Sequence, residues 1–261
     1  MSMLSHLRQV VVLPAALIVA TILSGCVSSG DKAGATRTLR IGTDATYPPF
    51  ETVNTNTGRP DGFDIDLIKE ICAINGRTPE FIVTPFDGMI PGLNGKKYDV
   101  VISAMTITPE RAAQIDFSEP YYLAGQTIAV PESVTTIEGL PDLYGKKVGV
   151  QLGTTGEIMA KNTAGIDVFS FDNIGAAFID MANGNLDAVL NDYPTTQAYI
   201  KSHGGAKMVG PILSKEQYGI AVRKGDVELL KDINHALTEL KNSGKYSELH
   251  QKWFGSEPAI E

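Results

Sequence analysis

Cysteine and histidine are scarce in this sequence. Its 261 residues include two cysteines and four histidines. No histidine lies near a cysteine or another histidine along the chain, so the ligand spacing of a zinc site is absent and no metal is expected. If Cys26 is modified, Cys72 has no partner in the chain. We therefore expect no intrachain disulfide.

Basic residues are outnumbered by acidic ones. The chain has 22 Lys and Arg against 30 Asp and Glu, a formal net charge of −8. This balance argues against nucleic acid as a partner. The sequence also lacks a Gly-x-Ser-x-Gly elbow, a phosphate-binding P-loop and a dinucleotide fingerprint, so it offers no motif for an enzyme of those kinds and no cofactor is expected.

One apolar run lies near the N-terminus, at residues 10–23. It is short for a membrane span but has the length of the apolar core of a signal peptide. The following Leu-Ser-Gly-Cys resembles the bacterial lipobox, which implies that residues 1–25 are removed and that Cys26 carries lipid, palmitate included, as a membrane anchor. A simple signal peptide with a fortuitous cysteine is the alternative. Residues 26–37 are rich in Ser, Gly, Ala and Thr and predict a flexible tether.

A buried strand followed at once by polar residues is the most informative stretch. Residues 100–102 are β-branched and apolar, and the hydroxyls of Ser103 and Thr106 follow them. Thr-Pro-Glu at 108–110 predicts a helix start that places Arg111 in the first turn. Since ligands bind beyond the carboxyl ends of strands in open α/β sheets, a guanidinium there suits a small carboxylate. An ordinary surface arginine is the alternative.

Other predicted strands also end in polar or aromatic residues. Asp44 and Tyr47 follow a strand at 39–43, and Phe86 follows one that begins at residue 81. Phe86 either flanks a ligand or covers the sheet edge. From residue 62 the apolar spacing becomes helical.

The second half of the chain repeats this organisation. A strand at 147–151 ends in Gln151 and leads to Thr154 and Thr155 at a helix start, whose free N–H groups favour an anion. Either threonine could instead be only the N-cap. A strand at 186–190 leads to Asp192, which either faces the same crevice or caps the next helix.

Several segments together resemble the family 3 bacterial solute-binding proteins, which receive polar amino acids for ABC importers. The clearest is Gly-Phe-Asp-Ile-Asp-Leu-Ile-Lys-Glu-Ile-Cys at 62–72. The other matching segments lie at residues 42–50, 99–111, 117–122, 145–155, 186–192 and 252–255.

The resemblance implies an α/β fold of the type II periplasmic-binding-protein kind, with a ligand cleft between two lobes. Lobe 1 would comprise residues 38–124 plus 220–255, and lobe 2 residues 125–219. The lobes would close about a hinge at 123–126 and 216–219. An extracytoplasmic, monomeric protein that delivers an amino acid to an inner-membrane ABC permease is expected.

The resemblance also implies residue roles. Arg111, Thr106 and Thr155 would hold the ligand carboxylate. Asp192, with groups of Ser103 and Ala104, would hold the ammonium. Side-chain specificity would fall to Asp44, Tyr47, Phe86 and Gln151, with Asn191 as a further candidate. Asp44 and two aromatic rings favour arginine, lysine or glutamine over glutamate, whereas Gln151 and Gly156 replace the bulkier or apolar contacts of the basic-amino-acid branch.

Two alternatives stay open. A cyclohexadienyl dehydratase, which shares this fold, would need a cleft acid of raised pKa, and the sequence suggests no extra acid beside Asp192. A ligand-binding partner of a membrane sensor is the other, and genes neighbouring the locus would distinguish it from an importer.

Overall fold

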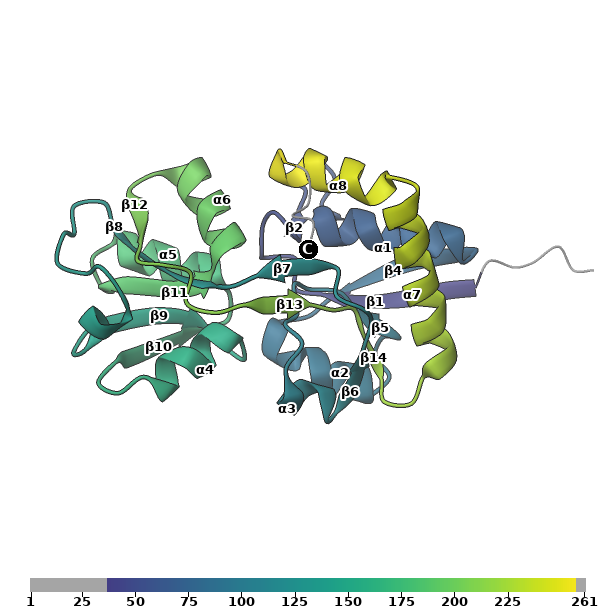
Figure 1. Ribbon diagram of the computed structural model, residues 1–261, viewed down its shortest axis with the longest axis horizontal. Coiled ribbons are helices and arrows are strands. Elements are labelled where there is room, and N and C mark those ends of the chain that lie inside the picture. Colours follow the sequence, from purple (N-terminus) through teal and green to yellow (C-terminus); the bar gives the residue numbers. More distant parts are fainter. Residues whose placement is uncertain (1–36, 257–261) are drawn as a thin grey trace, which may run out of the picture. The chain divides into compact units, whose positions relative to one another are not determined.

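The computed structural model describes residues 37–256 (Figure 1). The expected signal peptide, the Cys26 lipidation site and the tether up to residue 36 lie outside the described residues. Within residues 37–256, no helix is both long and apolar enough to cross a membrane.

Sheet I has the strand order β4-β1-β5-β14-β6. Its strands are β1 (Arg37–Thr43), β4 (Arg77–Val83), β5 (Val100–Val101), β6 (Ile115–Phe117) and β14 (Ala221–Arg223). β1 pairs in parallel with β4 and β5, whereas β14 is antiparallel to both its neighbours. Pro79 lies in β4, at the edge of the sheet, where a residue without an N–H is tolerated.

Helices cover both faces of sheet I, because its strands alternate between two apolar clusters. Val100 packs with α1 (Phe63–Ile74), α7 (Val227–Asn242) and α8 (Lys245–Phe254). Val101 packs on the other face with Met89 of α2 (Met89–Asn94). The short η1 (Phe86–Gly88), α3 (Pro109–Ala112) and the pair β2 (Thr52–Val53) and β3 (Pro60–Asp61) complete this lobe.

Sheet II has the order β10-β9-β11-β8-β12 and forms the second lobe. Its strands are β8 (Gln126–Pro131), β9 (Lys147–Gln151), β10 (Asp167–Phe171), β11 (Ala188–Asp192) and β12 (Ala206–Val209). Leu190 packs on the face of α4 (Thr155–Asn162), and Val189 packs on that of α5 (Ile174–Ala182). α6 (Tyr193–His203) and η2 (Leu140–Leu143) are the other helices.

Two short strands join the sheets. The chain leaves sheet I through β7 (Tyr122–Ala124) and returns through β13 (Glu216–Tyr218), and these strands pair antiparallel between the lobes (Figure 1). An isolated bridge ties Thr106 to Tyr218. These two strands overlap the segments predicted as the hinge, residues 123–126 and 216–219.

Candidate ligand pocket

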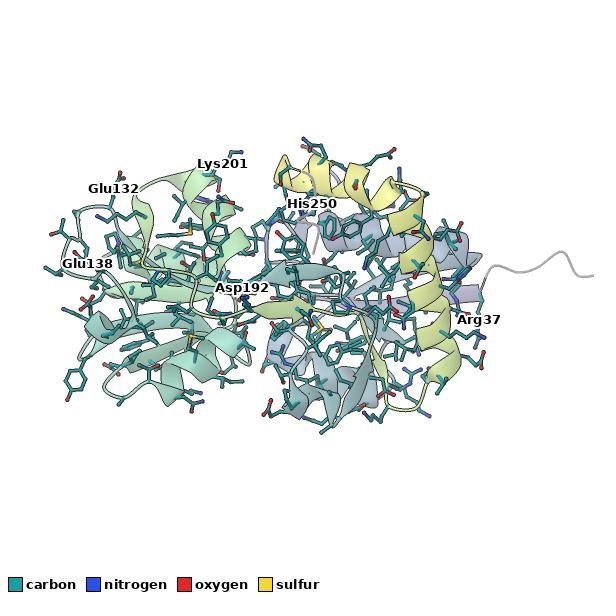
Figure 2. The ribbon with its side chains drawn as sticks, in the orientation of Figure 1. Arg37, Glu132, Glu138, Asp192, Lys201 and His250 are labelled. Atoms are coloured by element: carbon teal, nitrogen blue, oxygen red, sulfur yellow. The ribbon has the colours of Figure 1, made fainter. Side chains whose placement is uncertain are left out.

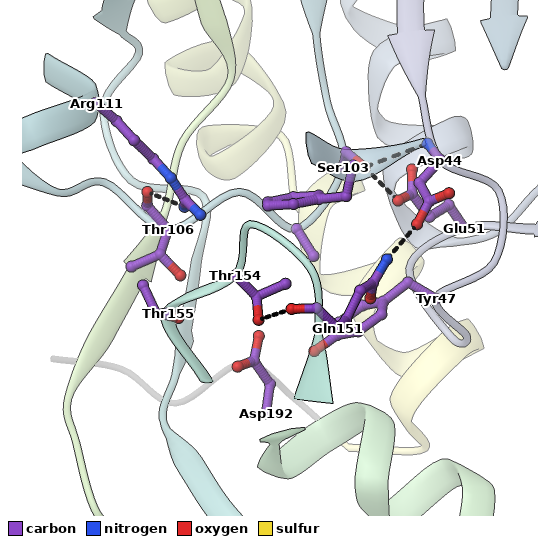
Figure 3. Close-up of a pocket in the computed structure, with 12 residues that line it drawn as sticks. Asp44, Tyr47, Glu51, Ser103, Thr106, Arg111, Gln151, Thr154, Thr155 and Asp192 are labelled. Atoms are coloured by element: carbon purple, nitrogen blue, oxygen red, sulfur yellow. Dashed lines mark hydrogen bonds between the residues drawn. The ribbon is translucent and has the colours of Figure 1, made fainter. Parts of the chain in front are cut away.

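One pocket lies where the carboxyl ends of β1, β5, β9 and β11 face each other (Figure 3). The space between its lining atoms is about 280 Å³, a volume that includes open solvent. Its lining residues are Asp44, Tyr47, Glu51, Phe86, Ser103, Ala104, Thr106, Arg111, Gln151, Thr154, Thr155 and Asp192. Ten of the eleven residues for which the sequence predicts ligand contacts are among them, and the eleventh, Asn191, is not. Their roles towards a ligand stay predictions.

Arg111 reaches into this pocket from the start of α3. Thr108 caps the helix by accepting a hydrogen bond from the Arg111 N–H at 3.2 Å. Nη1 of Arg111 donates to the Thr106 carbonyl at 2.7 Å, and Nη2 donates to the Gly153 carbonyl at 3.0 Å. The residue is 7% exposed and its guanidinium lies 5.2 Å from the Phe86 ring centre. The alternative of an ordinary surface arginine is therefore wrong.

The backbones of the two lobes come close together at Gly153. Its φ is +77°, and an added Cβ would lie 3.1 Å from the Asp87 Cα of lobe 1. Only glycine combines this backbone conformation with this space. The Gly153 carbonyl can consequently reach Arg111 across the cleft.

Asp192 supplies the opposite charge from the end of β11. Figure 2 shows it close to the crossing strands, and Tyr218 and Gln126 both donate to its carboxylate. Although Asp192 occupies the N-cap position of α6, its side chain makes no capping bond among the described residues. Burial, then the nearby charge of Glu216, raises the pKa of Asp192 to about 7. The capping alternative is thus wrong for its side chain.

Glu216, on β13, is a buried acid that the sequence analysis missed. Its carboxylate accepts from the hydroxyls of Thr106 at 2.6 Å and Thr155 at 2.8 Å. Nε2 of Gln126 donates to it at 3.1 Å and also donates to Asp192. The expectation of no extra acid beside Asp192 is therefore wrong. The available signal was an acid placed inside a predicted hinge segment.

Thr154 and Thr155, at the start of α4, were each expected to be either the N-cap or a ligand contact. Thr154 is the N-cap, because its hydroxyl oxygen accepts from the Glu157 N–H at 3.2 Å. Thr155 has no capping duty and turns its hydroxyl to Glu216. Both still line the pocket.

Asp44 and Tyr47 contact lobe 2 at the other end of the pocket. Asp44 accepts from Nε2 of Gln151 at 2.7 Å and from the Thr46 hydroxyl at 2.8 Å. The Tyr47 hydroxyl donates to Oδ1 of Asn191 at 2.6 Å. Burial raises the pKa of the Asp44 carboxyl. These bonds close the lobes on each other around the pocket.

Glu51 is a second acid that the sequence analysis missed. It lines the pocket, and the hydroxyls of Thr43 and Ser103 donate to its carboxylate. Burial, followed by the neighbouring charge of Asp64, raises the pKa of Glu51 well above its usual range. Its place two residues after the Pro48-Pro49 pair was the only signal in the sequence, and it is a weak one.

Acidic groups outnumber basic ones in the pocket. Asp44, Glu51 and Asp192 line it, Glu216 lies behind Thr155, and Arg111 is the one basic residue in the lining. Within residues 37–256, no group of three or more His, Cys, Asp and Glu side chains could hold a metal ion. Because burial raises the pKa of Glu51 well above its usual range, the acids in the lining that can meet a cationic organic group are Asp44 and Asp192.

Two α/β lobes joined by a strand pair, with charges of both signs facing one cleft, define a two-lobe solute-binding protein. The chain belongs to the bacterial extracellular solute-binding proteins, family 3, whose model matches residues 39–256. The predicted family and the predicted two-lobe α/β fold are both confirmed.

Several relatives bind amino acids. The chain is 35% identical over 223 residues to the L-cystine-binding protein TcyJ of Escherichia coli (strain K12), covering 84% of each. It is 50% identical to an ancestral arginine-binding protein solved with arginine and with glutamine, with a TM-score of 0.81 over 84% of this chain and 98% of that one. It is 43% identical to the ancestral amino-acid-binding protein AncCDT-1, described as a precursor of cyclohexadienyl dehydratase, with a TM-score of 0.78 over 83% and 95%.

Proposed function

We propose that this chain captures a basic L-amino acid, with arginine favoured, for an amino-acid ABC importer. The observation that carries the proposal is that Arg111 of lobe 1 and Asp192 of lobe 2 line one pocket with Asp44 and Glu51. Relatives that bind arginine and cystine support the amino-acid class. An extracytoplasmic location follows from the proposed importer role.

The two ends of a zwitterion need partners of opposite sign. Charged groups that leave water bind only when charge and hydrogen bonds replace their hydration. Arg111 offers a guanidinium to a carboxylate. The hydroxyls of Thr106 and Thr155, which donate to Glu216 in this structure, would turn from Glu216 to the ligand carboxylate. Asp192 offers a carboxylate to the ammonium, and Ser103 and Ala104, which line the same pocket, would contact the ammonium from lobe 1.

The remaining acids suit a cationic ligand side chain. Asp44 already accepts from the neutral amide of Gln151, so a guanidinium or ammonium could take that donor's place with a stronger, charge-assisted bond. Tyr47 and Phe86 offer ring faces to a planar cation. Glutamate would bring a further carboxylate to an acidic site and is disfavoured.

Ligand binding would stabilise the closed arrangement of the lobes. The proposed contacts come from both sides of the cleft, so a ligand that engages all of them binds the closed state more tightly than the open one. Lobe 1 would comprise residues 38–124 plus 220–255, and lobe 2 residues 125–219. The protein would act as a monomer and present its closed form to a permease.

A thermal-shift screen with the twenty amino acids tests this function. A ligand that binds the folded chain raises its melting temperature by mass action. Arginine should give the largest rise, followed by lysine, and glutamate should give none. No shift with any amino acid would contradict the proposal.

Membrane attachment through Cys26 is a separate part of the proposal. The Leu-Ser-Gly-Cys sequence supports lipidation after removal of residues 1–25. Labelled palmitate should enter the wild-type chain in cells and should not enter a Cys26→Ala variant. Labelling of both proteins, or of neither, would contradict this attachment.

A dehydratase is a second candidate function, which the buried pair Asp192 and Glu216 favours. A carboxyl of raised pKa can act as a general acid, and the pKa of Asp192 is raised to about 7. Incubation with prephenate, followed by assay for phenylpyruvate, decides it. We expect no product, because Tyr218 and Gln126 already donate to the Asp192 carboxylate.

A further inference from the structure

A buried carboxylate lies behind the pocket wall without lining it. Asp64, in the first turn of α1, is 0% exposed. Its Oδ2 accepts from the backbone N–H of Ala104 at 2.8 Å and from the Tyr121 hydroxyl at 2.9 Å. Asp64 therefore ties a pocket residue to the segment that leads into β7.

Ala104 has a backbone conformation that alanine rarely adopts. Its φ is +44°, in the left-handed region. It lines the pocket together with Ser103, directly after the end of β5. A bond from its N–H to a carboxylate is stronger than one to a neutral acceptor, and it opposes relaxation to an ordinary conformation.

We propose that Asp64 is a positioning residue for the ammonium end of the pocket. By holding the Ala104 N–H, it keeps residues 103 and 104 turned into the cleft. The ligand part of this inference rests on the proposed function, whereas the effect of Asp64 on Ala104 does not. The rival explanation is that Asp64 serves only to fold the core around α1.

Three substitutions separate these explanations. Asp64→Asn keeps an oxygen that can accept from Ala104, and the other carboxylate oxygen has no hydrogen-bond partner among residues 37–256. Asp64→Leu keeps the shape and removes the acceptor. If that variant does not fold, Asp64→Ser replaces it, because its hydroxyl is too short to reach Ala104. Tyr121→Phe is the matched control, since it deletes the other bond to Asp64.

Amide hydrogen exchange of the ligand-free protein tests the positioning directly. Asp64→Leu or Asp64→Ser should lower the protection of the Ala104 N–H by more than about tenfold. Asp64→Asn and Tyr121→Phe should leave it within about threefold of wild type. Unchanged protection in the Asp64→Leu or Asp64→Ser protein would overturn the inference.

Binding of two probes tests the consequence for the pocket. L-Arginine has an ammonium, and its des-amino analogue 5-guanidinopentanoate lacks it. Asp64→Leu or Asp64→Ser should weaken the binding of arginine by more than about tenfold and the binding of the analogue by less than about threefold. The reason is that only the ammonium of arginine would contact residues 103 and 104. Adding Ala104→Gly should restore at least about half of the lost affinity on a logarithmic scale, since glycine adopts positive φ without an anchor.

Equal weakening of the two probes, or no recovery with Ala104→Gly, would show a merely structural role and overturn the inference. If wild type binds neither probe, the proposed function fails for basic amino acids. The exchange result would still decide whether Asp64 holds Ala104.

Discussion

Nε2 of Gln151 donates to Oδ2 of Asp44 at 2.7 Å, and this bond joins the end of β9 to the loop after β1 across the cleft (Figure 3). The neutral amide of Gln151 thus donates a hydrogen bond to Asp44, the acid that we propose binds the ligand side chain. The bond gives the closed lobes a contact that a cationic ligand would have to replace.

Asp44→Asn should discriminate between cationic and neutral ligands. Arginine affinity should fall by about 1.5–3 kcal/mol, the value of a hydrogen bond to a charged group, whereas glutamine affinity should change by less than about 1 kcal/mol. Titration calorimetry with both amino acids measures the difference. Asp167→Asn, on the exposed edge strand β10, is the control and should bind both as wild type does. Equal losses for the two ligands would remove Asp44 from its role.

Arg111→Ala should remove the main partner of the ligand carboxylate. The expected loss is about 2–5 kcal/mol, as for truncation of one member of a buried charge pair. Arg111→Lys should recover only part of it, because an ammonium cannot form the planar bidentate contact. Calorimetry with the exposed Arg59→Ala variant provides the control. Unchanged affinity in Arg111→Ala would exclude the carboxylate assignment.

Arginine binding should weaken as pH falls from 7 to 5. In the ligand-free protein, burial raises the pKa of Asp192 to about 7, so the carboxyl is protonated below that pH. The ligand ammonium requires the carboxylate, so binding releases a proton, and affinity should drop about tenfold per pH unit below 7. Calorimetry in buffers of different ionisation enthalpy counts the released proton.

The Asp192→Asn variant tests whether Asp192, and not another acid in the site, causes this pH dependence. The variant should bind weakly and should lose the pH slope assigned to Asp192. Burial also raises the pKa of Asp64 to about 7, and that group remains in the variant. A slope that persists unchanged in Asp192→Asn would assign the proton to Asp64 or another group.

Gly42→Ala should destabilise lobe 1. An added Cβ would lie 2.8 Å from Cε2 of the buried Tyr98 ring, and such overpacking costs about 1–3 kcal/mol. Denaturant unfolding measures the free energy of unfolding. Gly175→Ala is the control, because its Cβ would meet nothing nearer than 3.4 Å, in helix α5. A Gly42→Ala protein as stable as wild type would show that Tyr98 can move aside.

Local signals in the sequence predicted the positions of Arg111 and α1 well. Thr108 and Pro109 specify the start of α3 through a cap and a fixed φ, which needs no distant partner. The apolar spacing after Gly62 likewise specified the buried face of α1. Such signals act within a few residues and can be read from the chain alone.

The acids around the pocket show where sequence reasoning stopped. Glu216 accepts hydrogen bonds from Thr106 and Thr155, which lie 110 and 61 residues away in the sequence. Glu51 and Asp64 approach each other because the loop that contains Pro49 and Phe50 folds back onto the start of α1. Charge and composition do not specify such long-range meetings, so the acidity of the site became apparent only from its geometry.

The most direct test of zwitterion capture is titration calorimetry of the wild-type chain with L-arginine, its methyl ester and 5-guanidinopentanoate. The ester removes the charge that Arg111 would hold, and the des-amino compound removes the charge that Asp192 would hold. Each change should cost about 2–5 kcal/mol of binding free energy. If either analogue bound as tightly as arginine, the residue assigned to that missing charge, Arg111 or Asp192, would have no part in recognition.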